Sequence, residues 1–304
     1  MPESFRAGRD FIYRQGRVLE RRLFAARYQG APAPGVFDAL RAYRNPDGGF
    51  GHGLEPDKRC PASLPIDVEM ALSAMAMVGG GDPELLQGAC DFLSATAAAA
   101  AGGAVAPATP AIEEYPRAVH WSEWTYQPGL NPTAGLVGLL RQLGVEHQWV
   151  TDGSQFCWGQ LESADLSTEA HTLSEVLIFL DHNPERERAD RIAQAVIASL
   201  PTAQPFRWDL LESGYGLTPL HLAPTPSSRW RPLFSDSQIS SHLNRLQSDQ
   251  EEDGGWPLTW EPPSEASTLE WRGIETLRAL NTLVAYGRVA AELGAAPAQR
   301  PPAD

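Results

Sequence analysis

The strongest constraint on the fold lies at residues 250–256, where the sequence reads Gln-Glu-Glu-Asp-Gly-Gly-Trp. Segments with apolar residues at helical spacing flank it, near 236–249 on one side and 265–288 on the other. Paired glycines adopt positive φ without the penalty of a Cβ atom, so a chain can reverse tightly where a helix ends. The pattern therefore predicts a helix, a glycine corner and another helix.

The second of these helices has its own starting pattern. Ser267 and Glu270 have the spacing of a capping box, in which a Ser side chain and a Glu side chain satisfy the first free amides of a helix. Ile274, Leu277 and Leu280 follow on one stripe. We therefore expect an amphipathic helix that packs this stripe against a core.

A second glycine corner occurs at residues 44–50, which read Arg-Asn-Pro-Asp-Gly-Gly-Phe. The two copies of Gln-x-x-Asp-Gly-Gly-Trp, one of them degenerate at its first position, resemble the QW motif of the superfamily of squalene and other terpenoid cyclases and protein prenyltransferases. The resemblance implies an all-α fold, an α/α toroid of about five to six helical hairpins in inner and outer rings. It also implies a divergent bacterial member that acts in secondary metabolism. Because the motif in that superfamily ties helix ends together, we interpret Asp47 and Asp253 as structural turn residues.

The rest of the chain continues this helical pattern. No long segment calls for a β-strand, and we predict one domain over residues 1–289 with a disordered tail at 290–304. Residues 4–28 are expected to form a single amphipathic helix. Residues 95–111 are almost entirely Ala, Gly, Thr and Pro, and we expect a surface excursion there because such a segment has few large apolar groups.

Composition narrows the partners and the compartment. The 304 residues carry a net charge of −14, which would repel a nucleic-acid backbone. No apolar stretch suits a membrane span or a signal peptide, so we expect a cytoplasmic protein without membrane insertion. Cys60, Cys90 and Cys157 have no metal-ligand spacing and are interpreted as free thiols. Nothing in the sequence specifies an oligomeric state.

Helix starts that follow the corners are expected to open toward one end of the ring and to surround a central cavity. Partial positive charge at helix N-termini attracts acids and ligands to such an end. The residues predicted to gather there, mostly acids and aromatics, are Glu55, Asp57, Asp67, Glu69, Trp121, Glu123, Trp124, Asn131, Glu169, His171, Tyr215, Trp256, Trp260, Glu261, Glu270, Trp271 and Arg272. Aromatic faces with a few carboxylates can bind an apolar, cationic or polyhydroxylated ligand.

Four of these residues are the candidates for catalysis. We expect burial to raise the pKa of Asp67, Glu69 or Glu169, so that one of them acts as acid or base, with His171 beside them. Glu55 and Asp57 are the next candidates, and the remaining residues of the set are expected to bind the substrate. The alternative is structural, because acids in a first helical turn stabilise the helix by about 0.3–1 kcal/mol without any catalysis.

The departures from the superfamily limit what the resemblance implies. The proton-donating Asp-x-Asp-Asp string of cyclases is absent, as are the Asp/Cys/His zinc set of prenyltransferases and the Cys-His-Gly element of lanthionine cyclases. We therefore expect no metal and no cofactor.

The leading hypothesis is a terpenoid cyclase/prenyltransferase-like protein that binds a small, largely apolar metabolite and, if it is an enzyme, is a metal-independent cyclase or lyase/transferase. A non-catalytic binding or scaffold protein and a carbohydrate-active α/α barrel are the alternatives.

Overall fold

The protein is all-α. The computed structural model describes residues 2–97, 102–163, 168–210 and 214–291, and these ranges contain no β-strand, only isolated bridges. Four short 3-10 helices also occur, η1 (Pro110–Glu114), η2 (Glu123–Tyr126), η3 (Leu200–Thr202) and η4 (Arg231–Leu233). The α-helices are α1 (Pro2–Gln15), α2 (Val18–Tyr28), α3 (Pro34–Arg41), α4 (Pro65–Met77), α5 (Pro83–Ala97), α6 (Leu130–Gln142), α7 (Gln148–Ser163), α8 (Ala170–Asp181), α9 (Arg186–Ser199), α10 (Pro219–Leu222), α11 (Asp236–Ser248) and α12 (Glu265–Ala285). The predicted helical class is confirmed. The predicted tail beyond 291 lies outside the described residues.

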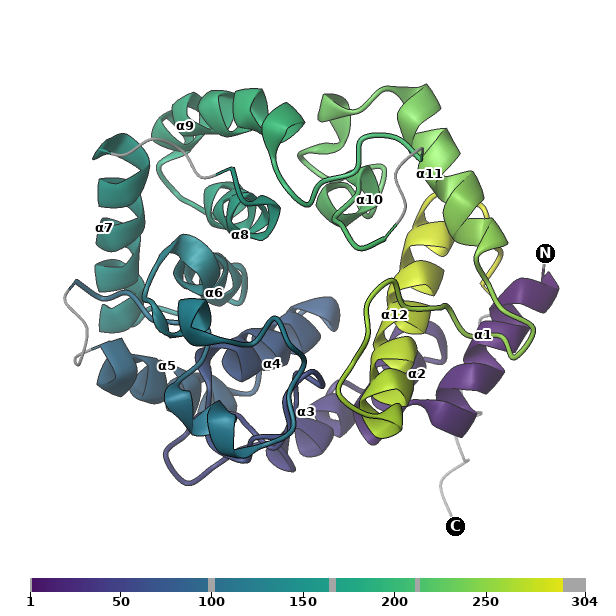
Figure 1. The fold of residues 1–304 in the computed structure, drawn as a ribbon, viewed down its shortest axis with the longest axis horizontal. Coiled ribbons are helices and arrows are strands. Elements are labelled where there is room, and N and C mark those ends of the chain that lie inside the picture. Colours follow the sequence, from purple (N-terminus) through teal and green to yellow (C-terminus); the bar gives the residue numbers. More distant parts are fainter. Residues whose placement is uncertain (1, 98–101, 164–167, 211–213, 292–304) are drawn as a thin grey trace, which may run out of the picture.

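The helices alternate between the centre and the periphery of the molecule. Figure 1 shows α4, α6, α8, α10 and α12 nearer the centre, with α5, α7, α9, α11 and α1 around them. Helix α6 packs against α4, α7 and α8, and the first helix, α1, packs against the last, α12. The two ends of the described chain therefore meet, and most of the buried apolar residues belong to one continuous core.

Small residues on α6 set its distance from α8. A Cβ on Gly138 would lie 2.7 Å from the carbonyl oxygen of Ile178, and a Cβ on Gly135 would lie 1.5 Å from Oε2 of Glu175. A larger side chain at either glycine would push the helices apart, because a close-packed interior has no room to absorb it. This close approach brings Glu175 into the interhelical packing.

The glycine corner before α12 ties this helix to α1. Asp253 accepts a hydrogen bond from the backbone N–H of Gly255 at 3.0 Å and two from Arg272 at 2.8 Å. Gly254 has φ of +92°, and a Cβ there would lie 2.3 Å from the carbonyl oxygen of Ala7 on α1. The structural interpretation of Asp253 is confirmed, since its carboxylate closes the turn that holds α12 against α1.

The first corner is built in the same way. Asp47 accepts from the backbone N–H of Gly49 at 3.0 Å and from Ser63 Oγ at 2.7 Å, so it links the corner to the segment before α4. Gly48 has φ of +87° and packs against the backbone of Gly88 on α5. This corner therefore ties the segment before α4 to α5, as the corner before α12 ties that helix to α1.

The prediction of one helix over residues 4–28 is wrong. The helix is interrupted between Gln15 and Val18, where Arg17 has an extended backbone with ψ of 169°. The Arg17 guanidinium then reaches Glu20 at 2.7 Å and the carbonyl oxygen of Leu54 at 2.7 Å. A periodic apolar pattern continues across such a break, and for this reason the pattern did not reveal it.

Two local predictions also need correction. The end of the low-complexity segment is not a surface excursion, because Ala104, Val105 and Ala108 are buried and Val105 bonds through its backbone to Thr133 on α6. Small side chains allow the backbone of this segment to approach α6 closely. Its buried N–H and C=O groups then form hydrogen bonds with side chains and with other backbone groups. Residues 98–101 lie outside the described ranges.

The capping box predicted at the start of α12 is likewise wrong. Ser264 is the N-cap and accepts from the backbone N–H of Ser267. Glu270 instead pairs with Arg59 at 2.6 Å. A long-range ion pair thus replaces the local bond that the spacing indicated.

The energetic effect of the close approach at Gly254 can be measured by comparison with Gly79, a glycine with open space around it. Gly254→Ala and Gly79→Ala both place a Cβ at positive φ, +92° and +74°, but no atom lies within 4 Å of the second site. Left-handed geometry costs about 1–2 kcal/mol in either variant, and the contact with Ala7 adds about 1–3 kcal/mol at Gly254 alone. Chemical denaturation should therefore show the larger loss for Gly254→Ala. Equal losses would mean that this corner does not hold α1.

Candidate functional site

The candidate site is built on a buried lysine. The Lys58 side chain is completely buried, and its Nζ lies 3.1 Å from Glu55 and 3.0 Å from Asp67. Its ammonium also lies 5.1 Å from the centre of the Trp121 ring. Although burial lowers the pKa of Lys58, the two carboxylates outweigh burial and raise it. This cluster fixes residues 51–60 onto the start of α4.

Asp57, the residue before this lysine, has its side chain among aromatic rings. Its Oδ1 accepts from Trp271 Nε1 at 2.8 Å, and its Oδ2 accepts from Trp260 Nε1 at 3.0 Å. The Nε2 atom of His120 lies 3.4 Å from Oδ2. The fold thus brings together Asp57, His120, Trp260 and Trp271, which come from three separate parts of the sequence. Asp57 and the two tryptophans were among the residues predicted to gather, and His120 was not.

The surroundings of Asp57 favour the protonated form of its carboxyl near neutral pH. Burial, helped by the charge of Glu55, raises its pKa to about 7, against smaller opposing effects of the two indole hydrogen bonds and of Lys58. Burial and the charge of His171 lower the pKa of His120. An acid with a pKa near the working pH is suited to proton donation.

Next to this acid lies a chain of three polar groups. Glu169 Oε1 lies 2.5 Å from Nδ1 of His171, and Nε2 of His171 lies 2.6 Å from the hydroxyl of Tyr215. The Tyr215 ring meets the Trp260 ring edge to face, with centroids 5.5 Å apart. Trp260 therefore contacts both Asp57 and Tyr215.

The expectation that burial raises the pKa of Glu169 is wrong. Desolvation does raise it, but the hydrogen bond and charge of His171 and the backbone N–H groups of His171 and Thr172 outweigh it and lower the pKa to about 2. Glu169 is the N-cap of α8 and stays ionised, so it accepts from His171 Nδ1. Burial raises the pKa of Tyr215 to about 12, so its hydroxyl keeps its proton and can donate it to Nε2 when His171 is neutral.

A pair of carboxyl groups from two half-buried glutamates lies between α4, α6 and α8. Glu69 and Glu175 share a side-chain hydrogen bond. Burial raises the pKa of Glu69 to about 7, and burial with the charge of Glu69 raises that of Glu175 well above its usual value. One oxygen of each is buried without a donor from another described residue. Two acids in this arrangement share a proton, because both cannot ionise side by side.

Asp67 is structural as well as buried. Its Oδ1 accepts the backbone N–H of Glu55 at 2.7 Å, and its side chain has no exposed surface. Burial raises its pKa to about 6 against the effect of Lys58. The expected rise in pKa is confirmed, but the carboxylate faces Lys58 and has no surface open to a ligand.

Other predicted ligand-binding residues lie elsewhere. Trp256 is buried in the corner before α12, where its Nε1 donates to the carbonyl oxygen of Leu246 at 2.7 Å, and Arg272 turns toward Asp253. Glu261 is exposed in the loop before α12.

Three further predicted residues belong to the segment before α6 and its first turn. Asn131 lies in the first turn of α6 with an extended backbone. Glu123 and Trp124 belong to η2, but their side chains lie outside the described part of the structure. None of the three has a described contact with Asp57.

Sequence reasoning missed three residues, namely Lys58, His120 beside Asp57, and Glu175 beside Glu69. Lys58 sits in a loop beside acids and resembles an ordinary surface lysine. Glu175 falls within a helix, where a glutamate usually faces solvent, although the facing small residues Gly135 and Gly138 could have indicated close packing. His120, next to Trp121, had no partner visible in sequence.

Searches with the sequence and with family models add no assignment. No protein-family model matches the chain, and no curated protein matches it. Across the described ranges, no three or more His, Cys, Asp or Glu side chains are grouped so that they could hold a metal ion. Among the same residues, no helix combines the length and apolar character needed to span a bilayer.

The carboxyl pair predicts a pH-dependent stability. The folded protein raises the pKa of Glu69 from about 4.5 to about 7, so folding favours the protonated carboxyl. The resulting contribution to the free energy of unfolding is fully present below about pH 4.5 and is lost as the pH rises through about 7. Glu175→Gln removes one titration and the repulsion on Glu69, so the free energy of unfolding should fall less between pH 5 and pH 8 than in the wild type. Denaturant midpoints at both pH values measure this difference.

Exposed Glu146 provides the control for that comparison. Glu146→Gln should follow the wild-type pH dependence. If Glu175→Gln loses as much stability as the wild type over this interval, the two carboxyls do not share a proton.

Proposed function

We propose that this chain is an α/α-toroid protein of the terpenoid cyclase and prenyltransferase type that acts on a small, largely apolar metabolite by metal-independent acid–base chemistry. The ring-like alternation of helices in Figure 1 and the aspartate–glycine corners support the fold part of this proposal. Asp57 is the acid and Tyr215, backed by His171, is the base.

The single observation that carries the proposal is the Asp57 carboxyl. Its pKa of about 7 leaves a large share of the protonated form at neutral pH, and the hydrogen bonds from Trp260 and Trp271 fix its orientation. Burial keeps much of the Asp57 carboxyl protonated at neutral pH, where a solvated aspartate would be ionised, so a proton is available for transfer to a ligand. A carbon–carbon double bond is a ligand group that such an acid can protonate.

The aromatic rings suit the charge that such a step would create. Trp260 meets Tyr215 and Trp271 edge to face, with centroid distances of 5.5 and 5.2 Å. Ring faces attract a cation by about 0.5–1 kcal/mol each at exposed sites, such as half-exposed Tyr215, and by about 2 kcal/mol when water is excluded. The same surface also supplies apolar contact area for a hydrocarbon skeleton.

The base side completes the proton balance. The proton of Asp57 moves to a ligand carbon, leaving an aspartate and a carbocation. With His171 in its neutral form, the cation then loses a proton to the Tyr215 oxygen while the Tyr215 proton moves to Nε2 of His171. Glu169, 2.5 Å from Nδ1, stabilises the resulting imidazolium. Proton exchange with solvent at half-exposed His120 and His171 restores both groups.

One observation favours a non-catalytic binding protein as the second candidate. Both oxygens of Asp57 already accept hydrogen bonds, and its side chain is only 4% exposed. A ligand must therefore displace part of this arrangement before it can take the proton. A binding protein would use the same aromatic surface without that step.

Deuterium incorporation distinguishes the two candidates. A hexane extract of bacterial cells is incubated with the protein in D2O and analysed by gas chromatography–mass spectrometry. The wild type should convert at least one component to a product that carries solvent deuterium, and Asp57→Asn should lower this conversion about 100-fold or more, the usual share of a general acid.

Asp38→Asn, on the exposed surface of α3, should leave conversion unchanged. Equal incorporation by Asp57→Asn and the wild type would contradict the role of Asp57. Retention of an extract component on the wild type without any deuterated product would favour the binding protein.

A further inference from the structure

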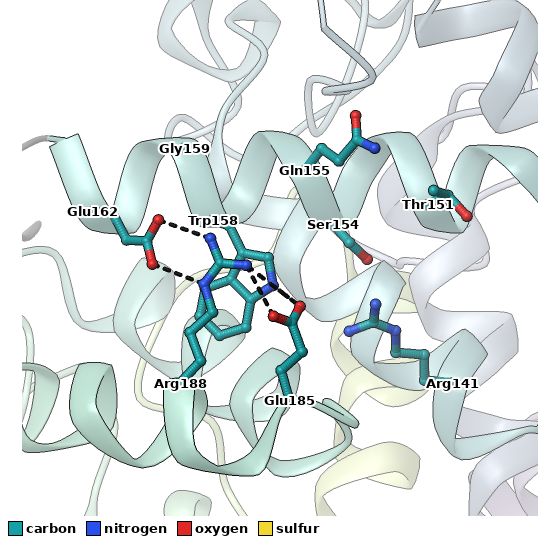
Figure 2. Close-up of a pocket in the computed structure, with 9 residues that line it drawn as sticks. All are labelled: Arg141, Thr151, Ser154, Gln155, Trp158, Gly159, Glu162, Glu185 and Arg188. Carbon is teal, nitrogen blue, oxygen red and sulfur yellow. Dashed lines mark hydrogen bonds and ion pairs between the residues drawn. The ribbon is translucent and has the colours of Figure 1, made fainter.

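A groove separate from the Asp57 site lies between α7 and α9. Its volume is about 450 Å³, within the range of small-molecule sites. Figure 2 shows one wall formed by α7 and the other by the start of α9, with Arg141 of α6 at one end. The residues that line it are Arg141, Thr151, Ser154, Gln155, Trp158, Gly159, Glu162, Glu185 and Arg188.

The unusual feature of the groove is an arginine without a polar partner. Among the described residues, none forms a hydrogen bond or ion pair with Arg141, and its Nη1 is buried. Its guanidinium points into the groove (Figure 2) and lies 5.5 Å from the centre of the Phe179 ring. Burial lowers the pKa of Arg141. Leaving such a donor unsatisfied is unfavourable, and an anionic ligand would remove that cost.

The other arginine of the groove is already neutralised. Arg188 binds Glu162 at 2.7 Å and Glu185 at 3.1 Å, and its guanidinium stacks 4.2 Å from the centre of the Trp158 ring. Glu185 also accepts from Trp158 Nε1 at 3.0 Å. This end of the groove is therefore a closed network that holds one more carboxylate than guanidinium, and the charge of Glu185 also acts on Arg141. The positive charge that a ligand meets is that of Arg141.

Neighbouring polar groups suit an oxygen-rich anion. Thr151 and Gln155 lie four residues apart on α7 and so share one helix face, and both are exposed along the groove. Their hydroxyl and amide can donate hydrogen bonds to oxygens that Arg141 does not reach. Arginine binds carboxylate and phosphate through two parallel N–H groups, which sets its preference among anions.

We propose that this groove is a binding site for a small oxyanion-bearing metabolite, with Arg141 as its anchor. The ligand presents a carboxylate or phosphate to the guanidinium and lies along the Thr151 and Gln155 face of α7. The site is separate from the Asp57 cluster, and its test does not depend on the reaction proposed there.

Titration calorimetry with two simple probes tests the proposal and distinguishes the two anions. Inorganic phosphate and succinate are titrated separately at an ionic strength held constant with chloride, since screening alone changes such affinities. At least one probe should bind the wild type saturably at one site per chain, with a Kd below about 10 mM. Arg141→Met should weaken that binding at least about tenfold, the effect of losing a charged hydrogen-bond donor.

Two further variants make the result specific. Arg191→Met removes the same charge from the exposed face of α9 and should bind as the wild type does. Gly159 has open space around its Cβ, so Gly159→Phe fills the groove with Arg141 intact and should also abolish binding. The proposal is overturned if neither probe binds the wild type, or if Arg141→Met and Arg191→Met bind equally well.

Discussion

The structure of the candidate site depends on the burial of one ammonium group. Lys58 has no exposed side-chain surface and is held by Glu55 at 3.1 Å and Asp67 at 3.0 Å. Removing one partner from a buried ion pair costs about 3–5 kcal/mol, because the remaining charge is left without compensation. The loop before α4 therefore has one stable conformation. That conformation directs Asp57, the residue just before Lys58, toward Trp260 in the segment before α12 and Trp271 on α12.

This arrangement separates acids that look alike in sequence. Asp67 neutralises Lys58, Asp57 is enclosed by indoles and retains its proton near neutral pH, and Glu169 caps α8 and stays ionised. Each role follows from the neighbours and not from the residue type. Environments that push the pKa values of nearby carboxyls apart provide an acid and an anion within one site, as acid–base chemistry requires.

Local chemistry in the sequence was enough to predict the helical class and the corners, because an aspartate beside paired glycines bonds within its own turn. It was not enough to rank the acids, since the contact between Asp57 and Trp271 joins residues far apart in the chain. Nor could it find Glu175, whose burial depends on the close approach of α6 through Gly135. Low complexity misled at Val105, because small side chains also permit close packing.

The protonation of Asp57 at neutral pH is the central claim, and carbon-13 NMR of labelled aspartate carboxyl groups measures it directly. The resonance that disappears in Asp57→Asn belongs to this residue, and its chemical shift is followed from pH 3 to pH 9. A midpoint near pH 7, with the carboxyl still largely protonated at pH 6, is the result the structure predicts. A midpoint at or below about pH 4, the value of a solvated aspartate, would show that the indole hydrogen bonds stabilise an anion and that Asp57 is not the acid.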